Sequence, residues 1–256
     1  MLLFAKASCL GMPGSLPAHV RCKAEKSQSC YPAYVPAAIF LPFALASLFM
    51  KTPNWRQNLR RKGGFWQDGR WYDLHVERRM PLFLPMLEEM VAALPPLDEG
   101  SVVCDLACGT GNAAFSVLTA YPSIQLVLLD KDLDLLHIAQ EKAAEIQAET
   151  QALQATISAD GEPIPGGPFD VIIASLALHV IVGHEIEGPE AEGRYELLFQ
   201  GILEALSPGG HLIIGDHVGT LGLYRQMKAM ERAGFTDVDC AWRQDEFFVC
   251  GGRAPE

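Results

Sequence analysis

Two glycines separated by one residue, Gly109 and Gly111, stand in the stretch SVVCDLACGTGN. An apolar strand that leads into a glycine-rich turn and then into a helix N-terminus is a recurring binding site for nucleotide-like ligands. Glycine has no Cβ, so the backbone of such a turn can approach its ligand closely. Asp130 ends the next apolar run, where a carboxylate can accept hydrogen bonds from both ribose hydroxyls. The spacing therefore predicts a site for a nucleotide-like ligand.

Asp105 separates the classes of ligand that such a turn can bind. The pattern Gly109-x-Gly111-x-x-Ala114 satisfies the relaxed fingerprint of dinucleotide-binding proteins. A pyrophosphate is anionic, however, and the Asp105 carboxylate just ahead of the turn would repel it. S-adenosylmethionine carries an ammonium and a sulfonium, which the same carboxylate attracts. The pattern favours S-adenosylmethionine, and an NAD-dependent oxidoreductase is the alternative from another class.

The stretch VVCDLACGTGN resembles the first motif of class I S-adenosylmethionine-dependent methyltransferases, and further matches follow in that family's order over residues 65–251. SADGEPIP resembles the segment whose acid meets the adenine amino group. PFDVIIASLALH is similar to the fourth motif, and LSPGGHLIIGDH to the helix-end turn and fifth strand. The sequence departs from the family at Ala107, where many members have glycine. The resemblance implies a set of cofactor-binding residues: Asp105, Ala107, Gly109, Gly111, Asp130, Lys131, Asp160, Gly161 and Ser175.

The segment WYDLHVERRMPLF, residues 71–83, is similar to the N-terminal cap of methyltransferases that modify the wobble uridine of transfer RNA. It is also similar to caps of many small-molecule methyltransferases. In such caps an aromatic residue and an arginine close over the methionine end of the cofactor. Tyr72 and Arg78 (or Arg79) are the matching residues here, and a solvated surface helix is the alternative reading.

Methyl transfer from a sulfonium is an in-line displacement, and the enzyme needs a base only if the acceptor must lose a proton. Candidate bases follow the fourth and fifth apolar runs: His179, His184, Asp216 and His217. Ligands bind at these strand ends in such sheets, and His179, Asp216 and His217 are the candidate catalytic residues. We therefore expect a methyltransferase acting on a small molecule. The alternatives are a methyltransferase of transfer RNA or protein, and a non-catalytic cofactor-binding subunit.

Apolar runs that alternate with helical stripes must position these residues. Strands are expected at residues 101–106, 124–130, 153–160, 169–178, 211–217, 235–242 and 245–252. Helical stripes are expected at Leu136, Ala139, Ala143 and Ile146, at Tyr195, Leu198, Ile202 and Leu206, and at Leu223, Met227 and Met230. The last two strands lack an intervening helix, which favours an antiparallel hairpin. The expected fold is α/β and Rossmann-like, a mostly parallel seven-stranded sheet with helices on both faces and an antiparallel edge hairpin.

The charge is divided unevenly along the chain. Residues 1–62 hold nine basic residues and one acid, a net charge of +8, and the remainder holds 11 basic and 30 acidic residues, a net charge of −19. An acidic body disfavours nucleic acid as a partner. Seven cysteines without a CxxC spacing indicate neither a zinc site nor a disulfide framework, and no metal is expected.

Three segments are expected along the chain: residues 1–50 as a targeting segment or an extension, 51–97 as a linker and helical cap, and 98–252 as the S-adenosylmethionine-binding domain. Residues 31–50 run without a charge, about the length that spans a bilayer, but three prolines interrupt the run. A cytoplasmic or organellar location is expected, and a membrane contact only through residues 31–50.

Overall fold

The computed structural model describes residues 68–148, 150–219 and 221–256, which belong to one compact unit. The expectations for the targeting segment and for the first part of the linker lie outside these residues. None of the helices in the described part of the chain has the length and apolar character needed to cross a membrane.

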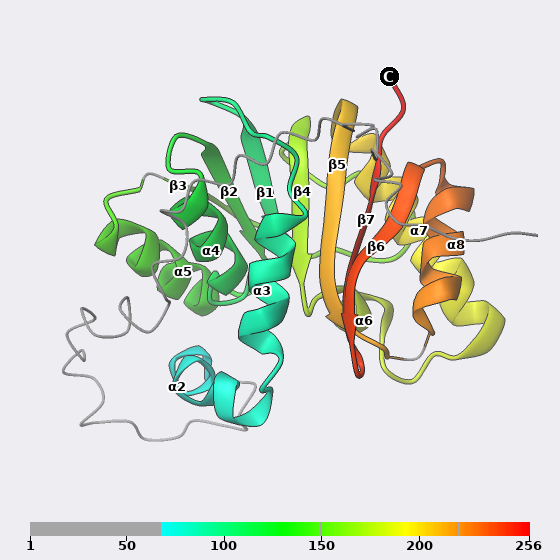
Figure 1. The fold of residues 1–256 in the computed structure, drawn as a ribbon, viewed down its shortest axis with the longest axis horizontal. Helices are drawn as coiled ribbons and strands as arrows, with labels where there is room; N and C mark the ends of the chain where they lie inside the picture. The colour runs from blue at the N-terminus through cyan, green and yellow to red at the C-terminus, as the bar shows by residue number, and fades with distance from the viewer. Residues whose placement is uncertain (1–67, 149, 220) are drawn as a thin grey trace, which may run out of the picture. The chain divides into compact units, whose positions relative to one another are not determined.

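A seven-stranded sheet with the order β3-β2-β1-β4-β5-β7-β6 is the centre of the fold (Figure 1). All pairs from β3 to β5 are parallel, and β7 runs antiparallel to both of its neighbours, β5 and β6. The expected α/β class and edge hairpin are confirmed. The strands are β1 (Val102–Leu106), β2 (Gln125–Asp130), β3 (Thr150–Gln154), β4 (Phe169–Ser175), β5 (Leu206–His217), β6 (Thr236–Gln244) and β7 (Phe247–Arg253).

Helices cover both faces of this sheet, because the central strands are apolar on both sides. One core cluster joins α3, α4 and α5 to one face, and a second joins α6, α7 and α8 to the other. Figure 1 shows the two groups on either side of the sheet. The helices are α2 (Gly69–Arg79), α3 (Phe83–Ala92), α4 (Asn112–Ala120), α5 (Leu133–Glu145), α6 (Leu178–Val182), α7 (Gly188–Glu204) and α8 (Leu223–Ala233).

The third strand is the main error of the sequence analysis, which placed it at residues 153–160. The observed strand, β3, is Thr150–Gln154, and its last residue pairs with Asp130, the last residue of β2. The Ala155 N–H still donates to the Asp130 carbonyl oxygen at 3.0 Å, but β2 ends at Asp130, so residues 156–158 leave the sheet. This departure places Ala155, Thr156 and Ile157 on the wall of a cavity described below.

Two residues of the expected helical stripes were also assigned wrongly. Ile146 is 40% exposed and follows the end of α5. Leu206 is buried, but it begins β5, because α7 ends at Glu204 and the chain enters the sheet earlier than the SPGG signal suggested. Gly234 ends α8 in a left-handed conformation (φ +110°). Glycine is the usual residue at this position, because it adopts this conformation without strain.

Two glycines of α7 provide a matched test of its packing. A Cβ at Gly201 would lie 2.2 Å from the Glu162 carbonyl oxygen, whereas a Cβ at Gly193 would meet nothing within 4 Å. We expect Gly201→Ala to destabilise the protein by about 1–3 kcal/mol through overpacking. Gly193→Ala should instead stabilise it by up to about 1 kcal/mol through helix propensity. Urea unfolding measures both, and equal effects would contradict the packing of α7 on the segment that contains Glu162.

Candidate active site

The glycine turn between β1 and α4 depends on left-handed backbone conformations. Ala107, Gly109 and Gly111 have φ values of +53°, +55° and +74°. Glycine adopts such values without strain, whereas Ala107 adopts one of them although it has a Cβ. A Cβ at Gly111 would lie 2.8 Å from the Cβ of Ala139. The turn therefore lies directly against α5.

Asp130 ties the end of β2 to this turn. Its Oδ2 accepts a hydrogen bond from the Gly109 backbone N–H at 2.8 Å, and its Oδ1 accepts one from the Asp132 N–H at 2.9 Å. The residue is buried and lines the larger cavity. Its carboxylate thus lies at the cavity wall beside the glycine turn.

Asp105 lies beneath the turn and lines neither of the two cavities. Its Oδ2 accepts a hydrogen bond from the Ala114 backbone N–H at 3.0 Å, in the first turn of α4. Its Oδ1 is buried without a hydrogen-bond partner. Burial raises the pKa of this carboxyl to about 7, with a smaller contribution from the nearby Asp130 carboxylate and an opposing effect of the Ala114 hydrogen bond. A positive ligand above the turn would stabilise its charged form.

The Asp105→Asn variant should differ from the wild type in the pH dependence of stability. The folded-state pKa of about 7 exceeds the ordinary value of about 4, so between these pH values the folded protein binds a proton that the unfolded chain releases. This carboxyl therefore makes wild-type stability fall as pH rises from about 4 to about 7. An amide does not titrate.

The unfolding free energy of Asp105→Asn, relative to the wild type, should rise by about 2–4 kcal/mol over that range. Denaturant unfolding of both proteins without cofactor, between about pH 4.5 and about pH 8, measures the difference. A difference that stays constant with pH would show that Asp105 titrates normally.

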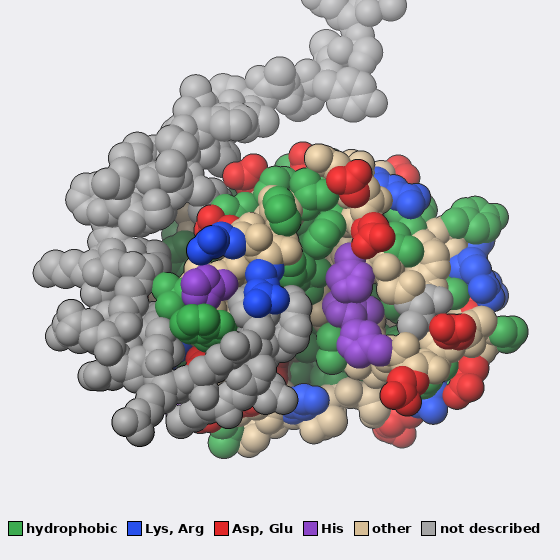
Figure 2. All heavy atoms as spheres, turned by 90° about the horizontal axis from the view of Figure 1, so that it is seen from below, with side chains coloured by type: hydrophobic (Ala, Val, Ile, Leu, Met, Phe, Trp, Pro, Cys, Tyr) green, Lys and Arg blue, Asp and Glu red, His purple; other side chains and the backbone are tan. Residues whose placement is uncertain are grey.

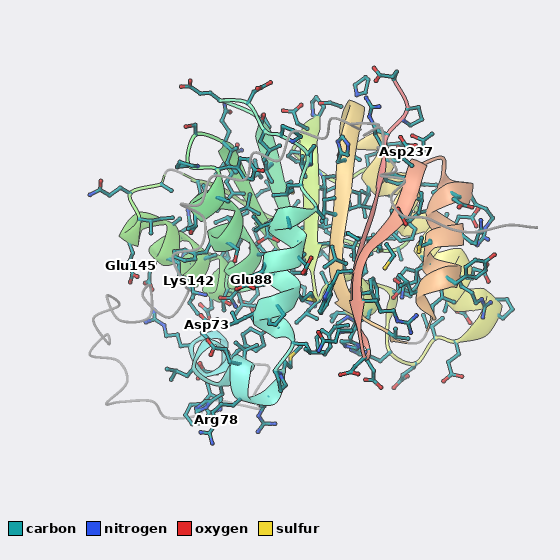
Figure 3. All side chains as sticks on the ribbon, viewed as in Figure 1. Asp73, Arg78, Glu88, Lys142, Glu145 and Asp237 are labelled. Carbon is teal, nitrogen blue, oxygen red and sulfur yellow. The ribbon has the colours of Figure 1, made fainter. Side chains whose placement is uncertain are left out.

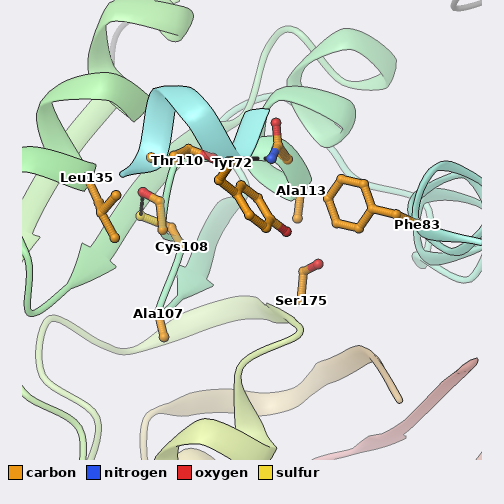
Figure 4. Close-up of a pocket in the computed structure, with 11 residues that line it drawn as sticks. Tyr72, Phe83, Ala107, Cys108, Thr110, Ala113, Leu135 and Ser175 are labelled. Atoms are coloured by element: carbon orange, nitrogen blue, oxygen red, sulfur yellow. Dashed lines mark hydrogen bonds between the residues drawn. The ribbon is translucent and has the colours of Figure 1, made fainter. Parts of the chain in front are cut away.

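A cavity of about 870 Å³ extends along the carboxyl ends of the parallel strands. Seven residues proposed from the sequence line it: Tyr72, Ala107, Asp130, Lys131, His179, His184 and His217. A smaller cavity of about 160 Å³ lies beside the glycine turn, under α2 (Figure 4). Tyr72, Ala107, Gly109 and Ser175 line this one. Figure 4 shows the Tyr72 ring reaching over the turn, and Phe83 contacts this ring edge-on with a centroid distance of 6.3 Å.

Besides Asp105 and Gly111, three further residues proposed from the resemblance line neither cavity: Asp160, Gly161 and Arg78. Asp160 is exposed, and its carboxylate accepts hydrogen bonds from Ser158 Oγ at 2.6 Å and from the Glu162 N–H at 3.2 Å, which lower its pKa. Gly161 follows it and lines neither cavity. Arg78 is exposed at the end of α2, where Figure 3 shows it directed away from the sheet. The structure therefore places none of these three residues in the lining of either cavity.

A polar network that the sequence analysis missed fastens α2 to the glycine turn. Asp73 Oδ1 accepts hydrogen bonds from Thr110 Oγ1 at 2.7 Å and from Asn112 Nδ2 at 3.1 Å. Lys142 on α5 lies 2.8 Å from both Asp73 Oδ2 and Asn112 Oδ1. Figure 3 shows Asp73 and Lys142 close together where α2 meets α5. These residues are far apart in sequence and form no known motif, so only the fold reveals the contact.

His179 and Asp216 form a buried pair at the other end of the large cavity. His179 Nδ1 lies 2.6 Å from Asp216 Oδ1, and the same oxygen accepts a hydrogen bond from the His217 backbone N–H at 2.8 Å. The rings of His179 and His217 are 4.2 Å apart between centroids. The three candidate catalytic residues therefore meet in one place, although Asp216 itself lines neither cavity. A carboxylate on Nδ1 leaves Nε2 of His179 available to accept a proton.

Comparisons with known proteins show the family of the chain. A family model described as "Methyltransferase domain" matches residues 97–246. Trans-aconitate 2-methyltransferase of Paracidovorax citrulli is 32% identical over 128 residues, which cover 49% of this chain and 42% of that protein. Ribosomal RNA small subunit methyltransferase H of Nocardia farcinica is 38% identical over 71 residues, 27% of this chain and 21% of that protein. The chain thus covers less than half the length of either relative.

The fold is shared with a solved structure as well. Human N-acetylserotonin methyltransferase, solved in complex with S-adenosylmethionine, superposes with a TM-score of 0.52 at 15% identity. The match covers 75% of this chain and 58% of that chain. At this level of identity, the likeness concerns the fold.

Proposed function

Because the chain belongs to the S-adenosylmethionine-dependent methyltransferases with the matched methyltransferase domain, we propose that it methylates a small molecule at the His179–Asp216 pair. One observation carries this proposal. A single cavity of about 870 Å³ is lined by Asp130 at one end and by His179 and His217 at the other. It can hold the cofactor over the glycine turn and an acceptor beside the histidines.

The cofactor end of the site uses the turn and the strand ends. We assign the ribose hydroxyls to Asp130, which already lies 2.8 Å from the Gly109 N–H. Leu129, Ala155 and Ile157 supply apolar wall around the same end, suited to the adenine ring. Tyr72 from the cap lines both cavities and is assigned to the methionine end. The sulfonium then lies between the turn and the histidines.

The chemical step needs an aligned nucleophile and, for a hydroxyl acceptor, a proton acceptor. We assign the proton to Nε2 of His179, because Asp216 holds Nδ1 at 2.6 Å and stabilises the imidazolium that forms. The acceptor oxygen forms a bond with the methyl carbon while the carbon–sulfur bond breaks. The electron pair of that bond stays on sulfur, giving S-adenosylhomocysteine. Among the candidate bases, this contact favours His179 over His217.

An RNA or protein acceptor is the second candidate, since one relative is named as a ribosomal RNA methyltransferase. The net charge of −19 beyond residue 62 weighs against a polyanionic partner. The family match favours methyl transfer over hydride transfer. Tyr224 and Lys228 have the Tyr-x-x-x-Lys spacing of some oxidoreductases, but Tyr224 is 71% exposed on α8 and neither lines the cavities.

Methyl-labelled S-adenosylmethionine incubated with cell extract and the full chain tests this proposal. The extract is separated into protein, RNA and small-molecule fractions after the reaction. We expect label in the small-molecule fraction, and a large decrease with the His179→Ala variant. Label confined to RNA or protein would contradict the assignment of a small-molecule acceptor.

A further inference from the structure

Two carboxylates from different elements hold the glycine turn, and the function proposed above uses only one of them. Asp130, at the end of β2, accepts the Gly109 N–H at 2.8 Å. Asp73, on α2, accepts the hydroxyl of Thr110, the residue after Gly109, at 2.7 Å. Thr110 is 4% exposed, and a buried hydroxyl requires such a partner. The helix α2 is thus attached to the turn directly beside the residue that Asp130 holds.

We propose that Asp73 is a positioning residue that couples closure of α2 to cofactor binding at the glycine turn. Tyr72, the residue before Asp73, lines both cavities, and Met80 at the end of α2 lines the larger one. A movement of α2 away from the turn therefore moves part of the wall of both cavities. Without the contacts of Asp73, the Tyr72 ring is no longer held in a fixed position over the turn.

The first residue of α2 lies in close contact with the turn and with α5. A Cβ at Gly69 would lie 2.8 Å from Thr110 Cγ2 and 2.6 Å from Leu135 Cδ2. The absence of a side chain allows this close approach. Gly69, Thr110 and Leu135 also line the smaller cavity. The residues that pack α2 onto the turn are therefore residues of the cavity itself.

Lys142 of α5 completes the contact by neutralising the Asp73 carboxylate. Its Nζ lies 2.8 Å from Asp73 Oδ2 and 2.8 Å from Asn112 Oδ1, and Asn112 Nδ2 donates to Asp73 Oδ1 at 3.1 Å. The Asp73 and Lys142 side chains are only 20% and 23% exposed, so salt and water screen this pair less than an exposed one. Asp73 thus joins α2 to the turn, to the first residue of α4 and to α5 at one point (Figure 3).

The cap helix and the candidate proton acceptor share one cavity. Figure 2 shows histidines side by side at one edge of a hollow, and His179, His184 and His217 line the large cavity together with Tyr72 and Met80. A closed α2 therefore bounds the space in which methyl transfer takes place. Exclusion of water strengthens the electrostatic interactions in such a space. This consequence rests on the function proposed above, whereas the coupling of α2 to cofactor binding is measurable without an acceptor.

Hydrogen exchange of the full chain with and without S-adenosylhomocysteine, measured by mass spectrometry, tests the inference together with calorimetry. Coupling between two events is reciprocal, so the ligand should slow the exchange of the α2 amides in the wild type. In Asp73→Ala the affinity should fall about fivefold or more. The ligand should still slow exchange in the turn, residues 107–111, but no longer in α2. Asp73→Asn should retain most of both effects, because its carbonyl oxygen can still accept the Thr110 hydroxyl.

Glu141→Gln is the matched control, because it removes another ion pair between α2 and α5. Arg70 Nη2 lies 2.8 Å from Glu141 Oε2, and the Glu141 side chain is 62% exposed. Exposed pairs contribute little, so this variant should show wild-type affinity and wild-type protection of α2. Thr110→Val removes the hydrogen bond to Asp73 from the other side and keeps the shape of the side chain. It should lose the protection of α2 as Asp73→Ala does.

Circular dichroism of each variant checks that the fold is retained. Wild-type protection of α2 by the ligand in both Asp73→Ala and Thr110→Val would overturn the coupling, and so would an equal loss of protection in Glu141→Gln. If the ligand binds the wild type and protects the turn but not α2, only the coupling is rejected. Failure of S-adenosylhomocysteine to bind the wild type would reject the cofactor placement of the proposed function as well.

Discussion

Replacing His179 by alanine is expected to lower turnover by about 10²–10⁴-fold while leaving the affinity for S-adenosylhomocysteine nearly unchanged. The residue lines the acceptor end of the cavity, and its Nδ1 lies 2.6 Å from the buried Asp216. Asp130 and the glycine turn, to which we assign the cofactor, do not contact it in any hydrogen bond of the described residues. Its removal should therefore affect the chemical step rather than cofactor binding.

Turnover with the acceptor found in the labelling screen, together with calorimetry of S-adenosylhomocysteine, measures this separation. His217→Ala is the informative comparison, because its ring is only 4.2 Å away but the contact it makes with Asp216 is through the backbone N–H. We expect a smaller loss of turnover for His217→Ala. A loss below about fivefold for His179→Ala would remove it as the proton acceptor and leave alignment as the main source of catalysis.

Replacing Asp130 by alanine should weaken cofactor binding by about ten- to a hundred-fold, since a hydrogen bond to a charged group contributes roughly 1.5–3 kcal/mol. The variant loses the proposed ribose contact. It also loses the acceptor for the Gly109 N–H at 2.8 Å, so the turn itself becomes less well held. Asp134→Ala is a matched control, because Asp134 is an exposed carboxylate in the first turn of α5.

Calorimetry of S-adenosylhomocysteine with both variants measures the difference. Wild-type affinity in Asp130→Ala would disprove the ribose assignment. An equal loss in Asp134→Ala would instead indicate a general effect of negative charge near the turn.

The sheet and the glycine turn could be predicted from sequence because their signals are local. Buried parallel strands such as VVCDL read as continuous apolar runs, and Gly111 stands where the turn approaches Ala139 too closely for a side chain. The prediction of the third strand was wrong because its local signal is weak. β3 is an edge strand with mostly exposed residues, so its apolar signal is weak, and the apolar segment beyond it belongs to the cavity wall instead.

The site itself was only partly accessible from sequence. Proximity to the strand ends was enough to single out His179, Asp216 and His217, but not to show which of them are paired. That pairing depends on β4 and β5 being neighbours in register. Asp73 and Lys142 gave no signal, because the contact between them depends on how α2 packs against α5. Asp105 was expected to attract the positive groups of the cofactor, but it lines neither cavity and accepts its hydrogen bond from the backbone of α4.

A crystal structure of the full chain with S-adenosylhomocysteine would locate the cofactor in the large cavity. We expect both ribose hydroxyls to lie within hydrogen-bonding distance of Asp130 and the sulfur to face the end of the cavity lined by His179 and His217. A sulfur atom directed away from these histidines, or a ribose held by other residues, would contradict this placement.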